Sequence, residues 1–167
     1  MHAADRLRLR TAAPADVPLI VELIGRLAAY EDLTQELHAN EAALREHLFG
    51  ERRYAEVLLA EVDGIAVGYA LFFHTYSTFS TKPGIWLEDV FVVPDHRRAG
   101  FGRALLARLA EIAVERGCGR LEWAVLDWNE PALAFYRGLG AGPVDGWTIC
   151  RLTGEALQRL AGPGPSR

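Results

Sequence analysis

The sequence contains little cysteine, no long apolar run and no excess of basic residues. Its two cysteines, Cys118 and Cys150 among 167 residues, form neither a disulfide framework nor a metal-ligand spacing, which favours a reducing compartment. The N-terminus lacks the apolar segment of a signal peptide, and no apolar run is long enough to span a bilayer. We therefore expect a cytoplasmic protein with no bound metal and no membrane partner.

The charge balance argues against a nucleic-acid partner. The formal net charge is −4 and the pI is about 5.7, whereas nucleic-acid binding requires a basic surface. An acidic balance is compatible with a small cationic molecule instead. Half of the residues are hydrophobic and 24% are charged, as in average globular proteins. The length predicts a single domain over residues 1–161, followed by a disordered Gly/Pro tail at 162–167.

Hydrophobic periodicity and turn residues predict the elements of the N-terminal half. A short alternating strand at 7–10 precedes an amphipathic helix within 11–33, for which Thr11 or Asp16 is the expected cap. A second helix is expected from the cap Asn40 to Gly50. Two β-rich runs within 54–76, joined by Asp63-Gly64, predict a β-hairpin.

The C-terminal half continues with alternating strands and helices. A strand at 85–93 ends at Pro94, and a helix follows at 103–116. The segment 120–128 is apolar on both faces and predicts a central strand. A short helix capped by Asn129 and a last strand at 147–153 complete the chain. This order predicts a mixed α/β sheet in one domain.

The turn RRAGFGR, residues 97–103, places two glycines and three arginines at the start of a helix. The third glycine of a dinucleotide fingerprint is missing, and there is no Walker G-K-[ST] sequence. Free backbone N–H groups at a helix N-terminus, flanked by Arg97, Arg98 and Arg103, suit a pyrophosphate. The alternative is a glycine turn with solvated arginines, which the turn alone does not exclude.

The turn resembles the acetyl-CoA signature of the GCN5-related N-acetyltransferase (GNAT) superfamily, Arg-x-x-Gly-x-Gly, here Arg97 to Gly102. The later segment NEPALAFYRGLGA also matches that superfamily in order and spacing. WLEDVFVVPDHR, AVLDWNEPALAFYRGLGA and AAYEDL resemble its diamine acetyltransferase branch, which includes spermidine/spermine and thialysine N-acetyltransferases. The resemblance implies the GNAT fold, a single mixed, mostly antiparallel, twisted sheet flanked by helices.

The resemblance also implies acetyl-CoA as co-substrate. Its pyrophosphate would lie on backbone amides from Arg98 to Arg103, and its pantetheine along Val90 to Val92. The implied cofactor-binding residues are Val90, Phe91, Val92, Arg97, Arg98, Ala99, Gly100, Phe101, Gly102, Arg103, Asn129, Glu130, Pro131, Ala132 and Tyr136.

Acetyl transfer to an amine requires a base, because an amine with a pKa of about 10 is protonated at neutral pH. It also benefits from an acid at the leaving thiolate. By resemblance, Tyr136 is the acid and Glu88 the base, acting through a water; a core role is the alternative for Tyr136. Strict alternation would put Glu88 and Asp89 on opposite faces, with Glu88 on the face of Val90 and Val92. Which of the two carboxylates is the base stays open. The oxyanion would be held by a backbone N–H near Phe91.

The acceptor side of the site is implied by Tyr30, Glu31, Glu88 and Asp89, although Tyr30 and Glu31 also fit an exposed helix end. An acidic pocket suits a polyamine or a lysine-like diamino acid. Ser77, where polyamine-specific members carry an acidic residue, favours thialysine or lysine, whose carboxylate would need Lys82 or an arginine.

Two other functions on the same fold stay open. One is a protein, peptide or aminoglycoside acetyltransferase, and the other is a non-catalytic acyl-CoA sensor, which would need neither Tyr136 nor Glu88. The resemblance further implies a homodimer that pairs through DGWTICRLT, residues 145–153.

Overall fold

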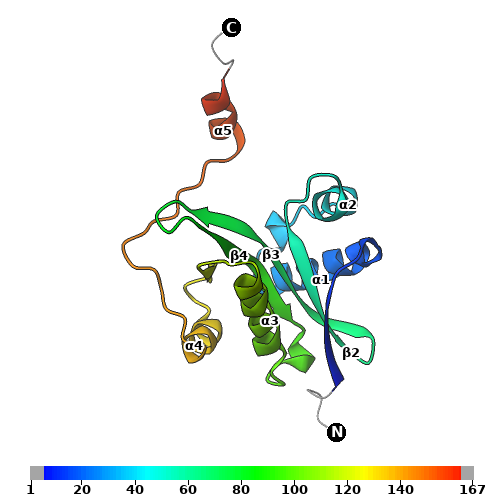
Figure 1. Cartoon of the computed structure of the whole chain (residues 1–167). Helices are drawn as coiled ribbons and strands as arrows, with labels where there is room; N and C mark the ends of the chain where they lie inside the picture. Colours follow the sequence, from blue (N-terminus) through cyan, green and yellow to red (C-terminus); the bar gives the residue numbers. More distant parts are fainter. Residues whose placement is uncertain (1–5, 163–167) are drawn as a thin grey trace. The chain divides into compact units, whose positions relative to one another are not determined.

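The computed structural model describes residues 6–162, which form two compact units, one up to Ala124 and the other from Val125 onward (Figure 1). The expected disordered tail at 162–167 lies outside the described residues except for Gly162. Within residues 6–162, no helix is long and apolar enough to cross a membrane.

The first unit is built on a five-stranded sheet in the order β1-β2-β3-β4-β5. The first four strands are antiparallel neighbours and β5 runs parallel to β4, so the expected mixed, mostly antiparallel sheet flanked by helices is confirmed. Its strands are β1 (Leu7–Thr11), β2 (Glu56–Val62), β3 (Ile65–Ser77), β4 (Lys82–Val92) and β5 (Leu121–Trp123). Its helices are α1 (Val17–Tyr30), α2 (Glu41–Phe49) and α3 (Phe101–Glu115), with short 3-10 turns η2 (Pro14–Asp16), η3 (Thr34–Glu36) and η4 (Pro94–His96).

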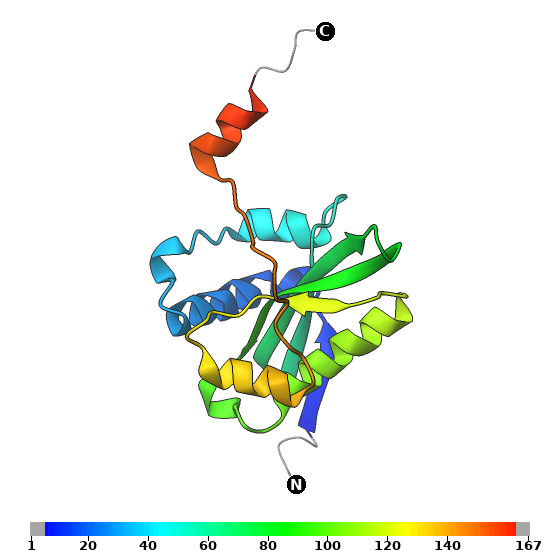
Figure 2. The same cartoon turned by 90° about the vertical axis from the view of Figure 1, so that its left-hand side faces the viewer.

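Two amphipathic helices bury the two faces of this sheet. The helix α1 lies on one side and α3 on the other (Figures 1 and 2). Each contributes an apolar stripe at helical spacing, Ile20, Leu23 and Leu27 from α1 and Leu105, Leu109 and Ile112 from α3, all buried. The middle of β2 is buried on both faces because it lies between the two helix layers.

Local turn and cap signals are confirmed. Val62 pairs with Ile65 across Asp63 and Gly64, whose φ values of 53° and 79° are those of a tight hairpin turn. The Asn40 side chain accepts a hydrogen bond of 3.0 Å from the Ala43 amide at the start of α2.

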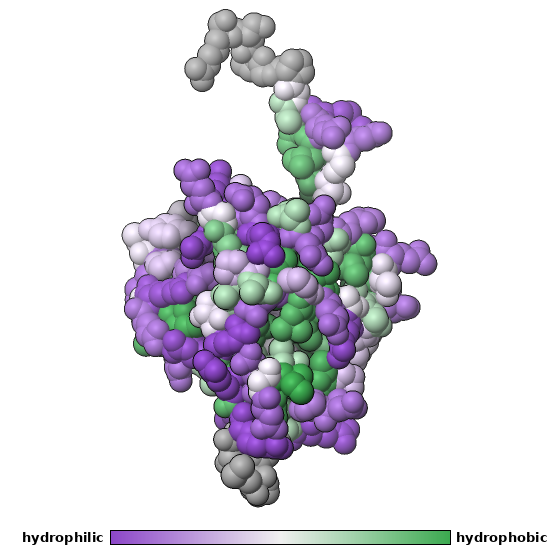
Figure 3. Space-filling model, turned by 90° about the vertical axis from the view of Figure 1, so that its right-hand side faces the viewer, coloured by the Kyte–Doolittle hydropathy of each residue, from purple (hydrophilic) through white to green (hydrophobic). Residues whose placement is uncertain are grey.

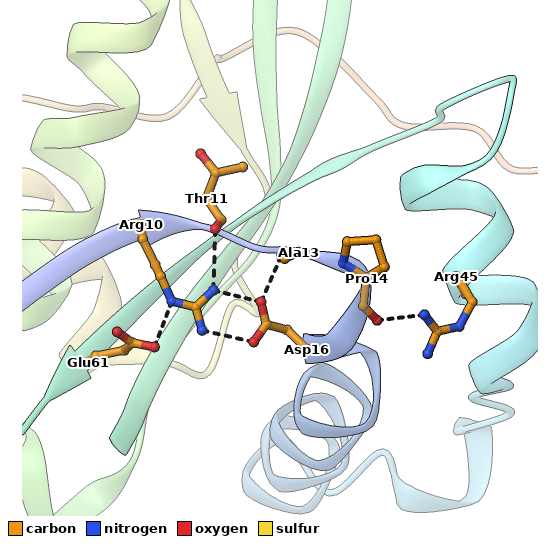
Figure 4. A network of polar contacts seen from close by, with 7 residues as sticks. All are labelled: Arg10, Thr11, Ala13, Pro14, Asp16, Arg45 and Glu61. Atoms are coloured by element: carbon orange, nitrogen blue, oxygen red, sulfur yellow. Dashed lines mark hydrogen bonds and ion pairs between the residues drawn. The ribbon is translucent and has the colours of Figure 1, made fainter. Parts of the chain in front are cut away.

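The start of α1 differs from the sequence expectation. Thr11 ends β1, and Asp16 occupies the N-cap position of α1 without a side-chain bond to the helix. Its carboxylate accepts two bonds from Arg10, at 2.6 and 2.8 Å, and one from the Ala13 amide (Figure 4). Arg10 also donates to Glu61 on β2 at 2.7 Å. A half-buried arginine is stabilised by carboxylate partners, and the Asp16 side chain serves as one of them instead of bonding to the amides of α1.

Two strands expected in the C-terminal part are shorter or absent. The segment 120–128 contributes only the three-residue strand β5. This strand is half-buried and, within residues 6–162, pairs only with β4, so it is not the central, fully covered strand that was expected. In the described part of the chain, residues 147–153 form no strand, since an extended segment becomes a strand only by pairing with a neighbour.

The second unit contains α4 (Glu130–Gly138) and α5 (Gly154–Ala161), and the sequence analysis had not predicted α5. The Asn129 cap of α4 is confirmed by a 3.2 Å bond from the Ala132 amide. Helix α5 is amphipathic: its hydrophobic and hydrophilic sides are visible in Figure 3, and Leu157 and Leu160 on it are exposed.

Candidate active site

The turn after β4 has the backbone that an anion site at a helix start requires. Gly100 adopts φ 87°, in the left-handed region that favours glycine, and α3 begins at the next residue. No side chain of the described chain caps this N-terminus. The first-turn amides of Phe101, Gly102 and Arg103 therefore point out of the helix without an intrahelical partner.

The three arginines of the turn differ in their surroundings. Arg97 donates from Nε to the Val92 carbonyl at 2.9 Å, and its guanidinium lies over the rings of Tyr30 and Phe91. Its side chain therefore connects β4 to the end of α1. Arg98 and Arg103 are exposed and remain as the cationic side chains for an anion at this turn.

One edge of β4 is open next to the turn. Its pairing with β5 is restricted to Ile85–Leu87, so in the described part of the chain residues 88–92 have no strand on that side. An open edge presents unpaired backbone N–H and C=O groups, which can bind an extended ligand by the same hydrogen bonds that join strands. The side chains of Phe91 and Val92 are buried, so contacts from these positions would come from the backbone.

A β-bulge lies at Glu88. Leu71 pairs with Asp89 and Phe72 with Leu87, which leaves Glu88 as the extra residue of β4. Asp89 shares a face with Leu71, and Trp86 shares the same face because it pairs with Phe73, two residues farther along β3.

The two carboxylates lie on the same face of the sheet. Glu88 accepts a 2.9 Å hydrogen bond from the Trp86 indole, which places it on the face of Trp86 and Asp89. Val90 pairs with Ala70 and lies on the other face. The expectations that Glu88 and Asp89 point to opposite faces, and that Glu88 shares the face of Val90, are therefore wrong, because the bulge shifts the alternation by one residue.

Asp89 forms part of a pocket of about 200 Å³ on the α1 side of the sheet. Three carboxylates, from Glu31, Glu36 and Asp89, are set among apolar side chains. The lining of this acidic pocket is Ile24, Leu27, Ala28, Glu31, Leu33, Glu36, Leu37 and Asp89. Carboxylates at apolar walls suit a ligand that combines cationic groups with a methylene chain.

The charges in this pocket affect one another. The pKa of Asp89 is raised from an ordinary value of 3.8 to about 6, mainly by burial and also by the nearby charges of Glu88 and Glu31. The Tyr69 hydroxyl opposes this rise by donating to Asp89 Oδ2 at 3.0 Å. Burial also raises the pKa of Glu31.

The structure thus brings several of the expected residues together. Tyr30 ends α1 and is 40% exposed, and Glu31 follows it into the acidic pocket with Asp89. Sequence analysis missed Glu36 and Tyr69. A single hydroxyl in the apolar run VGYALFF was the available signal for Tyr69, whereas Glu36 carried none.

The remaining expected residues belong to the second unit. Asn129 is buried and caps α4, and Glu130, Pro131 and Ala132 form its first turn. Tyr136 lies in the middle of α4, with its ring centre 5.4 Å from that of Phe135.

The open edge of β4 and the uncapped start of α3 can bind an extended ligand that carries a phosphate group, and the carboxylate pocket can bind a cation. Residues 20–141 match the model of the acetyltransferase (GNAT) family, and the chain belongs to this family. GNAT enzymes use acetyl-CoA as co-substrate, and this chain is an N-acetyltransferase.

Two of the known proteins that are similar to this chain are named after small amines that they acetylate. The thialysine N-epsilon-acetyltransferase of Bos taurus is 38% identical, over 92% of this chain and 96% of the relative. The L-ornithine N5-acetyltransferase NATA1 of Arabidopsis thaliana is 34% identical, over 92% of this chain and 87% of the relative. Among solved structures, integron cassette protein VCH_CASS6 from the mobile metagenome of V. cholerae has a TM-score of 0.80 at 24% identity, over 94% of this chain and 98% of that one, which supports the fold.

Proposed function

We propose that this enzyme transfers the acetyl group of acetyl-CoA to a primary amine of a small cationic acceptor, by direct attack in a ternary complex. One observation carries the proposal: β4 presents the carboxylate of Asp89 to the acidic pocket, and the same strand leads from its open edge toward the turn that begins α3. An amine bound at the pocket would therefore lie beside a thioester extended along the same strand.

The cofactor part follows from the backbone of the turn. The pyrophosphate is held by amides from Arg98 to Arg103, with the exposed Arg98 and Arg103 as counter-charges. The pantetheine pairs with the backbone of Val90 to Val92. By the family resemblance, Asn129 to Ala132 of the second unit also bind the cofactor. Arg97 contributes to cofactor binding only through its backbone, because its guanidinium contacts Tyr30 and Phe91.

The chemical roles are a base, an acid and an oxyanion donor. Glu88, on the acceptor face of β4, removes the proton of the attacking ammonium through a water, and Asp89 holds a cationic group of the acceptor. Tyr136 protonates the leaving thiolate of CoA. The amide of Phe91 stabilises the tetrahedral oxyanion.

The acceptor class we favour is a diamino acid of the thialysine, lysine or ornithine type, with polyamines as the alternative. The names of the two relatives support this choice. Lys82 does not fit as the partner of the acceptor's carboxylate, since it begins β4 seven residues before Asp89, roughly 23 Å along a strand. Arg97, whose guanidinium lies 4.2 Å from the Tyr30 ring centre, is the better candidate.

The test is release of CoA thiol by the purified protein with acetyl-CoA and a panel of amines. The panel contains thialysine, lysine, ornithine, spermidine, spermine, a lysine peptide and an aminoglycoside. Turnover with a small diamine, lost in Tyr136→Phe, supports the function and the acid together. Turnover on the peptide or the aminoglycoside alone supports the alternative acceptors, and acetyl-CoA binding without any turnover supports a sensor.

The homodimer remains part of this proposal, as does a cytoplasmic location. Large apolar side chains at Val144, Trp147 and Ile149 are more than half exposed, which supports burial of this segment against a second copy. Light scattering after size exclusion tests it: a monomeric mass at micromolar concentration contradicts the dimer.

A further inference from the structure

Tyr69 is the one buried side chain that donates a hydrogen bond to the carboxylate of Asp89 in the described part of the chain. We propose that Tyr69 is a positioning residue, whose hydroxyl orients Asp89 and keeps that carboxylate charged for the cationic group of an acceptor. This inference rests on the proposed function, because it assumes that the acidic pocket receives the amine.

The geometry fixes the carboxylate from one side. Tyr69 is fully buried on β3, opposite Phe91, and its hydroxyl lies 3.0 Å from Asp89 Oδ2. The structure records no other hydrogen bond to this carboxylate within residues 6–162, so Oδ1 remains for a ligand. A tyrosine held by a packed β-sheet has little rotational freedom, and the carboxylate that it binds is therefore oriented toward the pocket.

The charges around Asp89 make this donor necessary. Glu31 and Glu36 enter the pocket from the α1 side, and Glu88 is the neighbour on the bulge. Arg97 is a cation on this face, with its guanidinium 5.5 Å from the Phe91 ring centre. Burial and like charges favour the neutral acid of Asp89, and a neutral acid does not bind an ammonium by charge.

Tyr69 supplies the opposing effect. Its hydrogen bond stabilises the ionised carboxylate and opposes the effect of burial, so the pKa of Asp89 is about 6 with this bond in place. Burial and the Asp89 charge raise the pKa of Tyr69 itself, so the phenol stays protonated and keeps donating across the working pH range. The hydroxyl of Tyr69 therefore lowers the pH above which Asp89 is charged.

The experiment compares Tyr69→Phe with Tyr76→Phe, which removes the same atom from the same strand at a side chain that is 60% exposed. kcat/KM for the best acceptor is measured from pH 5.5 to 8.5. We expect the acid limb of Tyr69→Phe to move up by about one pH unit, the effect of losing one charged hydrogen bond. Relative to wild type, the variant should lose about fivefold at pH 6 and almost nothing through ionisation at pH 8.5.

A second measurement separates positioning from folding. Carboxyl 13C NMR of Asp-labelled protein follows the titration of Asp89, assigned with Asp89→Asn, and needs no turnover. KM for acetyl-CoA and the melting temperature are recorded for both tyrosine variants. The loss of Tyr69→Phe should appear in KM for the acceptor, leave KM for acetyl-CoA unchanged and disappear in the Asp89→Asn background.

The outcomes are distinct. An unchanged acid limb and an unchanged Asp89 titration in Tyr69→Phe overturn the inference, as does a pH-independent loss that follows the melting temperature. If wild type acetylates no amine of the panel, the proposed function fails instead. The NMR titration then still shows whether Tyr69 controls the charge of Asp89.

Discussion

The guanidinium carbon of Arg97 lies 4.2 Å from the centre of the Tyr30 ring, at the end of α1. Arg97 also opens the turn that leads into α3, and it binds the Val92 carbonyl at the end of β4. One side chain thus connects the turn expected to bind the cofactor with the helix end that presents Glu31 to the acidic pocket. We therefore expect the position of the proposed acceptor residues to depend on this contact.

Arg97→Met removes the positive charge and the stacking of the guanidinium on the aromatic rings, but it keeps a long, flexible side chain. We expect the free energy of unfolding to fall by about 1–2 kcal/mol, the value of a partly buried cation–π contact and one hydrogen bond. KM for the acceptor should rise several-fold, while KM for acetyl-CoA changes little. Arg103→Met, on the exposed side of the turn, should do the reverse. A larger effect of Arg97→Met on acetyl-CoA would place the guanidinium on the phosphates.

Gly100 is required for its backbone conformation and not for space. An added Cβ would meet nothing within 4 Å, but φ is +87°. Gly100→Ala should therefore cost about 1–2 kcal/mol of stability and raise KM for acetyl-CoA, since the left-handed conformation is strained for alanine.

Gly25 on α1 gives the matched control for Gly100. It is helical and its Cβ would meet only Leu37 at 3.9 Å, so Gly25→Ala should stabilise by about 0.5–1 kcal/mol. Urea unfolding checks both signs. Equal stability of wild type and Gly100→Ala would show that the turn accepts another conformation in solution.

The parts of the fold that sequence predicted are those specified by near neighbours. The cap at Asn40 depends on an amide three residues later, and the hairpin on the pair Asp63-Gly64. The turn at Gly100 is equally local. Each of these signals lies within a few residues and is readable without knowledge of the strand register.

The acidic pocket could not be read in the same way. The bulge at Glu88 exists only in the pairing of β4 with β3, and it places Glu88 on the face of Asp89, where strict alternation did not put it. The Tyr69–Asp89 bond joins residues 20 positions apart, and Glu36 reaches the pocket from a short turn without periodicity. The residues that form the acidic pocket therefore depend on the register between distant strands, which local sequence patterns do not reveal.

The Arg10–Asp16 pair gives a prediction for acid stability. The hydrogen bond from Arg10 lowers the pKa of Asp16, so its stabilising effect is present above the ordinary value of 3.8 and is lost as pH falls through the lower, folded value. Asp16→Asn should cost about 1–3 kcal/mol at pH 7. This difference should shrink below about pH 4, where wild type loses the same interaction.

The control for Asp16 is Glu22→Gln in the exposed pair with Arg26, where both side chains are more than half exposed. Such a surface pair contributes about 0.5 kcal/mol or less. Thermal unfolding between pH 2.5 and 7 measures both variants. A cost of Asp16→Asn that is constant over this range would contradict an ionic role.

Asp89 should have the opposite effect on stability. Its pKa is raised to about 6 in the folded protein, so the fold binds this proton more tightly than the unfolded chain does. The stabilisation is present below about pH 4 and is lost as pH rises through 6. Asp89→Asn avoids the buried charge and still accepts the Tyr69 hydrogen bond. Its free energy of unfolding should be about 2–3 kcal/mol higher than that of wild type at pH 7, and about equal to it at pH 4.

The same substitution should remove most of the acceptor binding, because the amide carries no charge for the ammonium. Glu88→Gln, at the exposed neighbour, should change stability by about 0.5 kcal/mol or less, while lowering kcat if Glu88 is the base. Urea unfolding at pH 4 and pH 7, with acceptor kinetics at pH 8, measures both effects. If Asp89→Asn is less stable than wild type at pH 7, the carboxylate has a structural partner that outweighs the cost of its burial. The hypothesis that Asp89 is a destabilising charge that serves to bind the acceptor is then wrong.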